Sequence, residues 1–335
     1  MIKKKIIAGL LILVMSATIL MGCGTIETSS DGKVKVFKIG VNQLLAHAAL
    51  DATYEGFVDA LKEAGYVDGK NIKIDYQNAQ NDQSTANTIA SKLVNDNNDL
   101  IFAIATPSAQ AVANATKDIP ILVSAVTDPA ASGLVASNEK PGGNVSGTSD
   151  MNPVKRQIEL LTKLVPDAKN IAILYCSSEA NSKIQSDIAI EVAKEYGITA
   201  VEATVANSNE IQQVVQSLVG KVDAIYAPTD NTIAGAMATV GQVANGNGIP
   251  VICGEGGMVD EGGLATYGID YYKLGRITGE QAVKIIKGEA TTDTMPIAYL
   301  PEEESKLKIN SEVAAQLNIT IPEDLQKELD AQDNK

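Results

Sequence analysis

The chain has 335 residues, of which 45% are hydrophobic, and its formal net charge is −14 at pH 7. This acidity argues against a nucleic-acid partner, because nucleic acids are recognised through basic patches. The length exceeds that of a typical single domain and allows two substantial hydrophobic cores.

Residues 1–22 are predicted to be a signal peptide that takes no part in the fold. Lysines at positions 3 to 5 precede a short apolar run that ends in Leu-Met-Gly-Cys, with Cys23 last. This tetrapeptide resembles the lipobox of bacterial lipoproteins, in which the signal is cut before a cysteine that carries lipid. A plain secretory signal or an uncleaved anchor is the alternative, although the run is short for a spanning helix. We therefore expect residues 23–35 to be a lipidated, flexible stalk that tethers the protein to the extracytoplasmic face of the bacterial cell membrane.

The first half of the remaining chain alternates between strand and helix patterns. Strands are predicted at residues 37–41, 71–76, 100–105 and 119–126. Helices are predicted at residues 50–61, at residues 82–95 and after Thr106. Such alternation predicts a parallel, doubly wound sheet.

Residues 99–129 are the most informative stretch, with two buried strands around a short helix. The strands are continuously apolar, as in a sheet covered on both faces, and they run out into polar residues. Pro107 suits the first helical position, and Thr106 is predicted to cap the helix. Ligands of open α/β sheets bind at the carboxyl edge, so Thr127 and Asp128 there become candidates. The alternative is that Thr106 and Asp128 only cap a helix and start a turn.

The second half repeats the same order. Strands are predicted at residues 170–175, 198–203, 222–227 and 249–252, with helices at 182–196, 209–219 and 232–244. Residues 145–150 are interpreted as a crossover between lobes, and residues 307–310 as one further crossing strand. The predicted fold is therefore α/β, with two doubly wound parallel-sheet lobes joined by a crossover-strand hinge. Lobe 1 is assigned residues 36–148 plus 271–302, and lobe 2 residues 149–270 plus 303–330.

Enzyme chemistry finds little support in the sequence. The single histidine and the absence of a Cys/His/Asp cluster leave no evident metal site, and neither GxSxG nor a P-loop occurs. Cys176 and Cys253 both follow apolar runs and are predicted to be buried free thiols without a disulfide. Because both fall in the second lobe, they do not suit a two-thiol racemase. We expect no enzyme activity, no cofactor and no metal.

Several motifs together resemble one known family. They are GFVDALKEAGYVDGKNIKIDYQNAQ at residues 56–80, ATPSAQAVANATKDIPILVSAVTDP at 105–129, PGGNVSGTSD at 141–150 and DAIYAPTDNTIA at 223–234. The chain is similar to substrate-binding lipoproteins of ABC importers, in the branch assigned to tryptophan or tyrosine uptake, which resemble type I periplasmic binding proteins. The resemblance implies two lobes closing over one small ligand, and delivery to a permease driven by an ATPase. One departure is Ala48 after His47, where the family commonly has proline.

An amino acid held between two lobes needs partners for both of its charges. Hydroxyls and amides at a helix start suit its carboxylate, and Thr106, Ser108 and Thr127 are the candidates. Its ammonium group needs a carboxylate, for which Asp230 is the first choice, then Glu255, then Asp128. Asp230 can instead be a helix cap, and Glu255 an exposed loop acid.

Other candidate ligand contacts come from strand ends and scarce aromatic residues. His47, Tyr226 and Tyr267 are possible stacking partners, since the chain has no tryptophan. The remaining candidates are Gln43, Ser177, Asn181 and Thr229. Sugar or nucleoside binding in the same fold, and a sensory role, stay open as alternatives. The expected partners are the ligand and the permease with its ATPase, with the protein itself a monomer.

Overall fold

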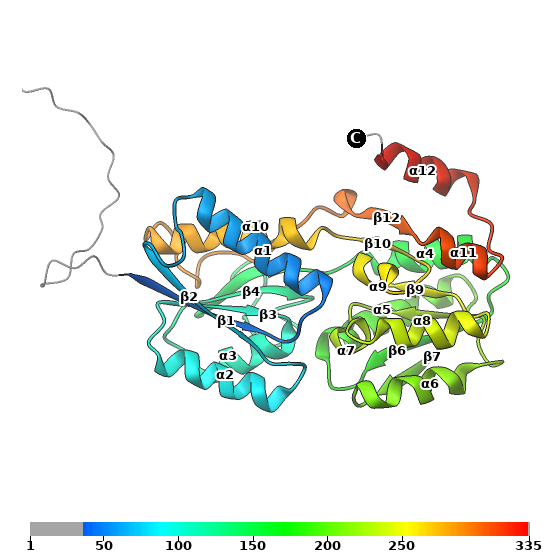
Figure 1. Cartoon of the computed structure of the whole chain (residues 1–335), viewed down its shortest axis with the longest axis horizontal. Coiled ribbons are helices and arrows are strands. Elements are labelled where there is room, and N and C mark those ends of the chain that lie inside the picture. The colour runs from blue at the N-terminus through cyan, green and yellow to red at the C-terminus, as the bar shows by residue number, and fades with distance from the viewer. Residues whose placement is uncertain (1–35, 334–335) are drawn as a thin grey trace, which may run out of the picture. The chain divides into compact units, whose positions relative to one another are not determined.

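The structure is a computed structural model that describes residues 36–333. The predicted signal peptide, the lipidation site Cys23 and the stalk lie outside the described residues. The described chain contains two six-stranded sheets, each with helices on both faces (Figure 1). None of its helices is long and apolar enough to cross a membrane.

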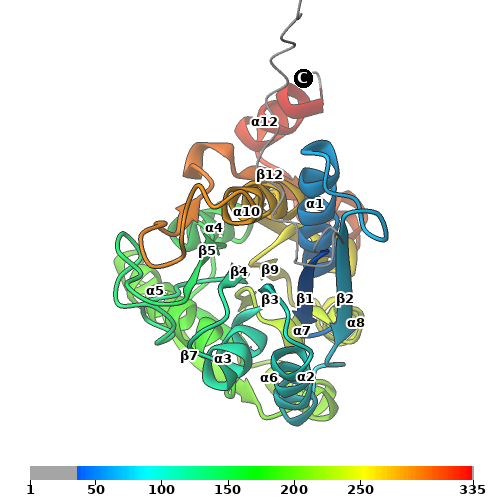
Figure 2. The same ribbon diagram turned by 90° about the vertical axis from the view of Figure 1, so that its left-hand side faces the viewer.

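Lobe 1 is built on the sheet ordered β11-β5-β4-β3-β1-β2, in which all paired strands are parallel. Helices α1 and α10 lie side by side on one face, and α2 and α3 cover the other (Figure 2). Its elements are β1 (Phe37–Gln43), α1 (Ala48–Glu63), β2 (Ile72–Asn78), α2 (Gln83–Asn95), β3 (Leu100–Ile104), α3 (Thr106–Ala115), β4 (Ile121–Val126), β5 (Val145–Ser149), α10 (Tyr271–Ile286) and β11 (Ala298–Tyr299).

Lobe 2 is built on the sheet ordered β12-β10-β9-β8-β6-β7, in which only the edge strand β12 is antiparallel. Its helices and strands are α4 (Val154–Leu164), β6 (Asn170–Cys176), α5 (Ala180–Glu195), β7 (Thr199–Val205), α6 (Ile211–Leu218), β8 (Ala224–Ala227), α7 (Asn231–Ala234), α8 (Met237–Gly246), β9 (Val251–Cys253), α9 (Gly256–Asp260), β10 (Ala265–Gly268), β12 (Lys306–Ile309), α11 (Ser311–Gln316) and α12 (Glu323–Asp333). Short 3₁₀ turns occur at Ser208–Glu210 and Glu302–Glu304.

The strand order of both sheets reverses at the first strand of the lobe. In lobe 1 β1 lies between β2 and β3, and in lobe 2 β6 lies between β7 and β8. Ligands of doubly wound sheets bind at this reversal, beyond the carboxyl ends of the two strands. The loops after β1, β3, β6 and β8 are therefore the places where a ligand site is expected.

The interpretation of residues 145–150 as a crossover is corrected by the structure. Residues 145–149 form β5, a fully buried strand of the first sheet, and the chain leaves lobe 1 only after it. The polar side chains are satisfied inside the lobe, since Thr148 Oγ1 donates to Ser124 Oγ and Ser146 Oγ to the Met295 carbonyl. Gly147 is required, because a Cβ there would lie 2.0 Å from the Val123 carbonyl oxygen. The predicted lobe boundaries stay a proposal, and the membership of β11 and β12 in different sheets supports one between residues 299 and 306.

Two helix predictions also differ from the structure. Thr106 is the first residue of α3, and Ala105, with φ of +81°, stands at its N-cap position. The single helix predicted at residues 232–244 is broken into α7 and α8. The break follows Gly235, where a Cβ would lie 2.8 Å from Leu45 Cδ1 of lobe 1.

The prediction of two buried free thiols holds, and two phenylalanines are buried as well. Phe57 and Phe102 are fully buried and stack with ring centroids 4.1 Å apart. Cys176 and Cys253 are buried free thiols. Both observations place these side chains in hydrophobic cores.

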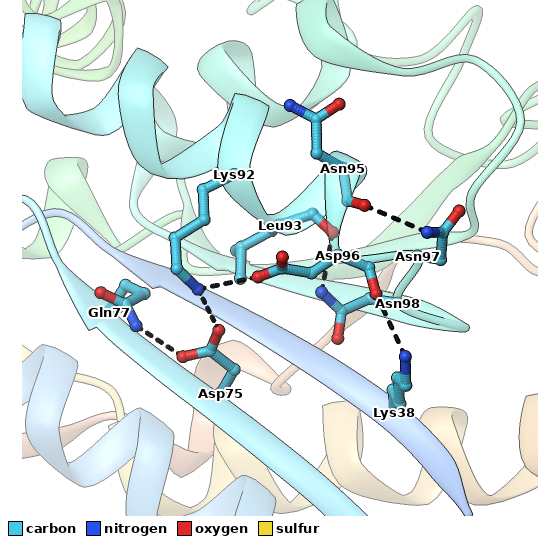
Figure 3. Close-up of polar contacts among 9 residues, drawn as sticks. All are labelled: Lys38, Asp75, Gln77, Lys92, Leu93, Asn95, Asp96, Asn97 and Asn98. Carbon is cyan, nitrogen blue, oxygen red and sulfur yellow. Dashed lines mark hydrogen bonds and ion pairs between the residues drawn. The ribbon is translucent and has the colours of Figure 1, made fainter.

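A polar cluster fixes the end of α2 that lies at the amino ends of the strands (Figure 3). Lys92 pairs with Asp75 of β2 and with Asp96, and the Lys38 ammonium group donates to the Asp96 carbonyl. Asn98 is buried, and its Nδ2 donates to the Leu93 carbonyl at 2.7 Å. The exposed ion pairs contribute little to stability, so the cluster mainly defines how the helix ends.

Candidate functional site

A small cavity lies where loops from both lobes meet. Half of its lining matches predicted site residues, namely His47, Thr127, Asn181, Thr229, Asp230 and Glu255. The other lining residues are Leu50, Ala125, Asp150, Asn231, Ala234 and Tyr271. A second hollow shares His47, Ala234 and Glu255 with it. Because the lining comes from the loops after β1, β4, β5, β6, β8 and β9, the site lies at the carboxyl edges of both sheets.

Hydrogen bonds join the two lobes beside this cavity. Asn81 Nδ2 of lobe 1 donates to Thr232 Oγ1 of lobe 2 at 3.1 Å, and Gln185 Nε2 of lobe 2 donates to Thr127 Oγ1 at 3.3 Å. His47 Nε2 lies 3.5 Å from Asn231 Oδ1. The lobes are thus in direct contact around the site.

Asp230 is held by donors of its own lobe. Its Oδ1 accepts from the Ile233 N–H and so caps α7, while Oδ2 accepts from the Cys176 N–H and the Ser182 hydroxyl. Burial and the nearby Glu179 carboxylate raise the pKa of Asp230. Asp230 is therefore a helix cap, which is the alternative that the sequence left open.

The carboxylate of Glu255 is also held by donors of its own lobe. Its carboxylate caps α9 by accepting from the Gly257 N–H at 2.5 Å and the Met258 N–H at 2.9 Å. It is 4% exposed, so it is not an exposed loop acid, and burial raises its pKa. Both lobe 2 acids line the cavity, but their oxygens already serve helix ends.

Asp150 is the acid that the sequence reasoning missed. It directly follows β5, is fully buried in the cavity wall, and its Oδ2 accepts from the Tyr271 hydroxyl at 2.7 Å. Its Oδ1 has no hydrogen-bond partner among residues 36–333. Burial raises the pKa of Asp150 to about 6, against the opposing effects of the Tyr271 and Thr127 hydroxyls. A usable signal existed, because residues 145–150 end in a polar residue just as the neighbouring strands do.

Asn181 provides a second free acceptor in the cavity wall. Its Nδ2 donates to the Thr229 carbonyl at 3.0 Å, which turns Oδ1 away from that partner. Within the described chain, Asn181 Oδ1 is buried without a hydrogen-bond partner. Buried acceptors without partners are costly, so Asp150 Oδ1 and Asn181 Oδ1 call for a ligand that brings N–H or O–H donors.

The remaining predicted residues do not line the cavity. Gln43 Nε2 donates to Asp51 and to the Leu45 carbonyl, and Ser108 Oγ donates to Asn42 Oδ1. Thr106 is buried in α3, with no partner for its hydroxyl among the described residues.

Asp128 starts a turn by accepting from the Ala130 and Ala131 N–H groups, as its structural alternative predicted. Ser177 is exposed and donates to the Val205 carbonyl.

The two tyrosines proposed for stacking have other surroundings. Tyr226 is fully buried in the lobe 2 core, where its hydroxyl donates to Gln157 Oε1 at 2.7 Å. Tyr267 packs under Arg156, whose guanidinium carbon lies 3.9 Å from the ring centroid. Tyr271, which was not considered, is the tyrosine that lines the cavity. No group of His, Cys, Asp and Glu side chains within residues 36–333 is suited to holding a metal ion.

Two doubly wound lobes with a cavity at their facing carboxyl edges define the type I periplasmic binding protein class. Residues 38–332 match the family of ABC transporter substrate binding proteins, and the chain belongs to that family. The match confirms the family and fold predicted from the sequence. It also agrees with the expectation of a binding protein in place of an enzyme.

Two proteins of related sequence carry more specific descriptions. A tyrosine-binding protein of Clostridioides difficile is 48% identical over 341 residues, which cover 99% of this chain and 94% of the relative. A crystal structure described as the ABC domain of Streptococcus pneumonia in complex with L-Trp is 42% identical. It superposes with a TM-score of 0.85, over 88% of this chain and 98% of that one.

A third relative is described as a ligand-free, open structure. The ligand-free, open structure of a substrate binding protein with adhesive properties from Clostridium difficile is 51% identical and covers 86% of this chain and 97% of its own. Its TM-score is nevertheless only 0.66, against 0.85 for the L-Trp complex. The two scores therefore do not follow the order of sequence identity.

Proposed function

We propose that this protein captures an aromatic amino acid, such as tyrosine or tryptophan, between its lobes and presents it to an ABC permease. The observation that carries the proposal is the pair of free buried acceptors, Asp150 Oδ1 and Asn181 Oδ1, in the wall of the interlobe cavity. An α-ammonium group supplies donors and a positive charge for both. The tyrosine-binding relative and the relative crystallised with L-Trp support the ligand class.

The ligand carboxylate is assigned to lobe 1. Helix α1 begins after His47, and no described side chain caps its first N–H groups. An uncapped helix N-terminus attracts an anion. In lobe 2 the N-termini of α7 and α9, which also face the cavity, are already capped by Asp230 and Glu255. A zwitterion therefore fits best with its carboxylate toward α1 and its ammonium group toward Asp150.

The aromatic side chain is assigned to the apolar part of the wall. Leu50, Ala125 and Ala234 offer apolar surface there, and Tyr271 offers a ring. This assignment replaces the stacking partners Tyr226 and Tyr267, which lie in other packing environments.

The location and partners complete the proposal. The lipobox-like sequence ending at Cys23 supports a lipid anchor on the extracytoplasmic face of the membrane. The family match supports partnership with a permease and its ATPase. The protein is proposed to act as a monomer, because one chain contributes both walls of the cavity.

The test is thermal melting of the soluble chain from Gly24 onward against the twenty amino acids, several sugars and several nucleosides. A ligand at about 100 times its dissociation constant stabilises the folded state by about 2.7 kcal/mol, which raises Tm by several degrees. A shift with tyrosine, tryptophan or phenylalanine alone is the expected result. A shift only with a sugar or a nucleoside would overturn the amino-acid assignment while leaving the fold untouched.

A further inference from the structure

Glu179 lies beside the lobe 2 residues that touch lobe 1. It directly precedes α5 and is 3% exposed. Its Oε1 accepts from both the N–H and the hydroxyl of Thr232, each at 2.9 Å. Its Oε2 accepts from the N–H of Asn231 at 3.0 Å and from Asn231 Nδ2 at 2.6 Å. Oε2 also accepts from Asn181 Nδ2 at 3.2 Å. One buried carboxylate therefore holds the backbone and the side chain of two successive residues, Asn231 and Thr232, and the amide of Asn181.

The same two residues reach across to lobe 1. Thr232 Oγ1 accepts from Asn81 Nδ2 at 3.1 Å, and Asn231 Oδ1 faces His47 Nε2 at 3.5 Å. Glu179 itself contacts neither Asn81 nor His47 in any hydrogen bond of the described chain. Its influence on the lobe contact runs through Asn231 and Thr232.

The Glu179 carboxylate determines which atom donates and which accepts in these contacts between the lobes. A carboxylate only accepts, so the hydroxyl proton of Thr232 is committed to Glu179 and the oxygen is left to accept from Asn81. In the same way the amide of Asn231 turns its Nδ2 to Glu179 and its Oδ1 to His47. His47 then needs a proton on Nε2. Burial lowers the pKa of His47, and the neutral tautomer with that proton on Nε2 satisfies the contact.

We propose that Glu179 is a positioning residue for ligand capture, which presents two oriented acceptors to donors of lobe 1 and thereby stabilises the closed arrangement of the lobes. A closed state that is more stable slows ligand release, because the ligand leaves only when the lobes separate. The proposal needs the proposed function only for its ligand readout, since closure of the ligand-free chain is measurable by itself.

The first variant is Glu179→Gln, which keeps the size of the side chain but replaces one acceptor oxygen by an amide donor. That donor opposes a donor of Asn231 or Thr232, so one of the two side chains has to turn. With L-tyrosine and L-tryptophan as probes in stopped-flow measurements on the mature chain, we expect dissociation to accelerate about ten-fold. The association rate should change far less. Fluorophores on the two lobes should report a lower closed fraction without ligand.

The matched control is Asp223→Asn in the same lobe. Asp223 also accepts from backbone N–H groups, those of Lys169 and Asn170, but at the opposite end of β6 from the cavity. The variant Asp223→Asn makes the same change of acid to amide. Because Asp223 lies away from the cavity, the variant should leave the ligand dissociation rate and the closed fraction as in the unmodified chain. Equal changes in both variants would overturn the positioning role.

A double-mutant cycle tests the link itself. Asn81 has φ of +59°, so Asn81→Gly removes the donor of lobe 1 without straining the backbone. If Glu179 acts through Thr232, the effect of Glu179→Gln on dissociation shrinks when Asn81 is absent. Full additivity would overturn the proposal.

If Glu179→Gln does not fold, Thr232→Val is the second variant. It removes only the hydroxyl that joins Glu179 to Asn81, and ligand dissociation should still accelerate. Should neither amino acid bind, the proposed ligand fails, and the closed fraction of the ligand-free chain still decides the role of Glu179. An unchanged closed fraction would overturn it.

Discussion

The two lobes share one topology but present opposite electrostatics to the cavity. In lobe 2 the helices α7 and α9 have Asp230 and Glu255 at their N-cap positions, and these side chains accept the first N–H groups. In lobe 1 the N-cap positions of α1 and α3 are His47 and Ala105, and neither side chain makes a capping hydrogen bond. The helices α3 and α7 follow equivalent strands, β3 and β8, and only α7 is capped by an acidic side chain. The difference teaches that a cavity between two similar lobes can still orient a zwitterion.

Asp150→Asn is expected to have the largest effect, because Asp150 is the acid in this wall whose Oδ1 has no partner within residues 36–333. Loss of its charge removes the counterion of the ammonium group. A buried charge left unpaired costs about 3 kcal/mol or more, so affinity for the amino acid should fall about 100-fold by isothermal titration calorimetry. Asp128→Asn, outside the cavity, is the control and should bind as the unmodified chain does. Unchanged binding by Asp150→Asn would break the proposed orientation.

The pH dependence follows from the same residue, whose pKa is raised from 3.8 to about 6. The folded state holds this proton more tightly than the unfolded chain. The resulting stability of the ligand-free protein is therefore fully present below about pH 4 and lost as pH rises through about 6. Ligand affinity should change in the opposite direction. It should fall by up to about ten-fold per pH unit below pH 6, because the ligand ammonium group needs Asp150 in its ionised form. Melting and titration between pH 4.5 and 8 measure both trends, and Asp150→Asn should flatten them.

His47→Asp tests lobe 1 by making it resemble lobe 2. The backbone at His47 is extended, with φ of −158° and ψ of 163°, which an N-cap aspartate adopts readily. The new carboxylate would cap α1 and repel the ligand carboxylate. Affinity should be about ten-fold or more below that of His47→Asn, which caps without charge. Equal affinity in the two variants would place the ligand carboxylate elsewhere.

Asp230→Asn should affect the fold more than the ligand. Asp230 accepts from the Cys176 and Ile233 N–H groups and from the Ser182 hydroxyl, and an amide cannot accept all three. Loss of these bonds should cost about 1–3 kcal/mol, a fall in Tm of several degrees in a melting experiment. A variant with unchanged Tm and lost affinity would restore Asp230 as the ammonium partner, as the sequence first suggested.

Prediction succeeded where a residue pattern is sufficient by itself. The strand β3 is continuously apolar because it is buried on both faces. Its sequence alone therefore predicts a strand of a parallel sheet. Prediction failed at β5, whose polar side chains are satisfied by Ser124, Thr127, Thr278 and Met295, all more than 20 residues away in the chain. Because β5 was not predicted, Asp150 was not a candidate site residue. A residue in a crossover is not expected to lie at the edge of a sheet.

The sequence by itself determined the alternation of strands and helices, the duplication into two lobes, the family and the edge of the sheets at which a ligand site would lie. These depend on local periodicity and on motifs that can be read along the chain. Only the tertiary structure decided which acids are free to meet a ligand. Asp230 and Glu255 differ from Asp150 in the donors that folding brings to each carboxylate, and residues distant in sequence supply or withhold those donors.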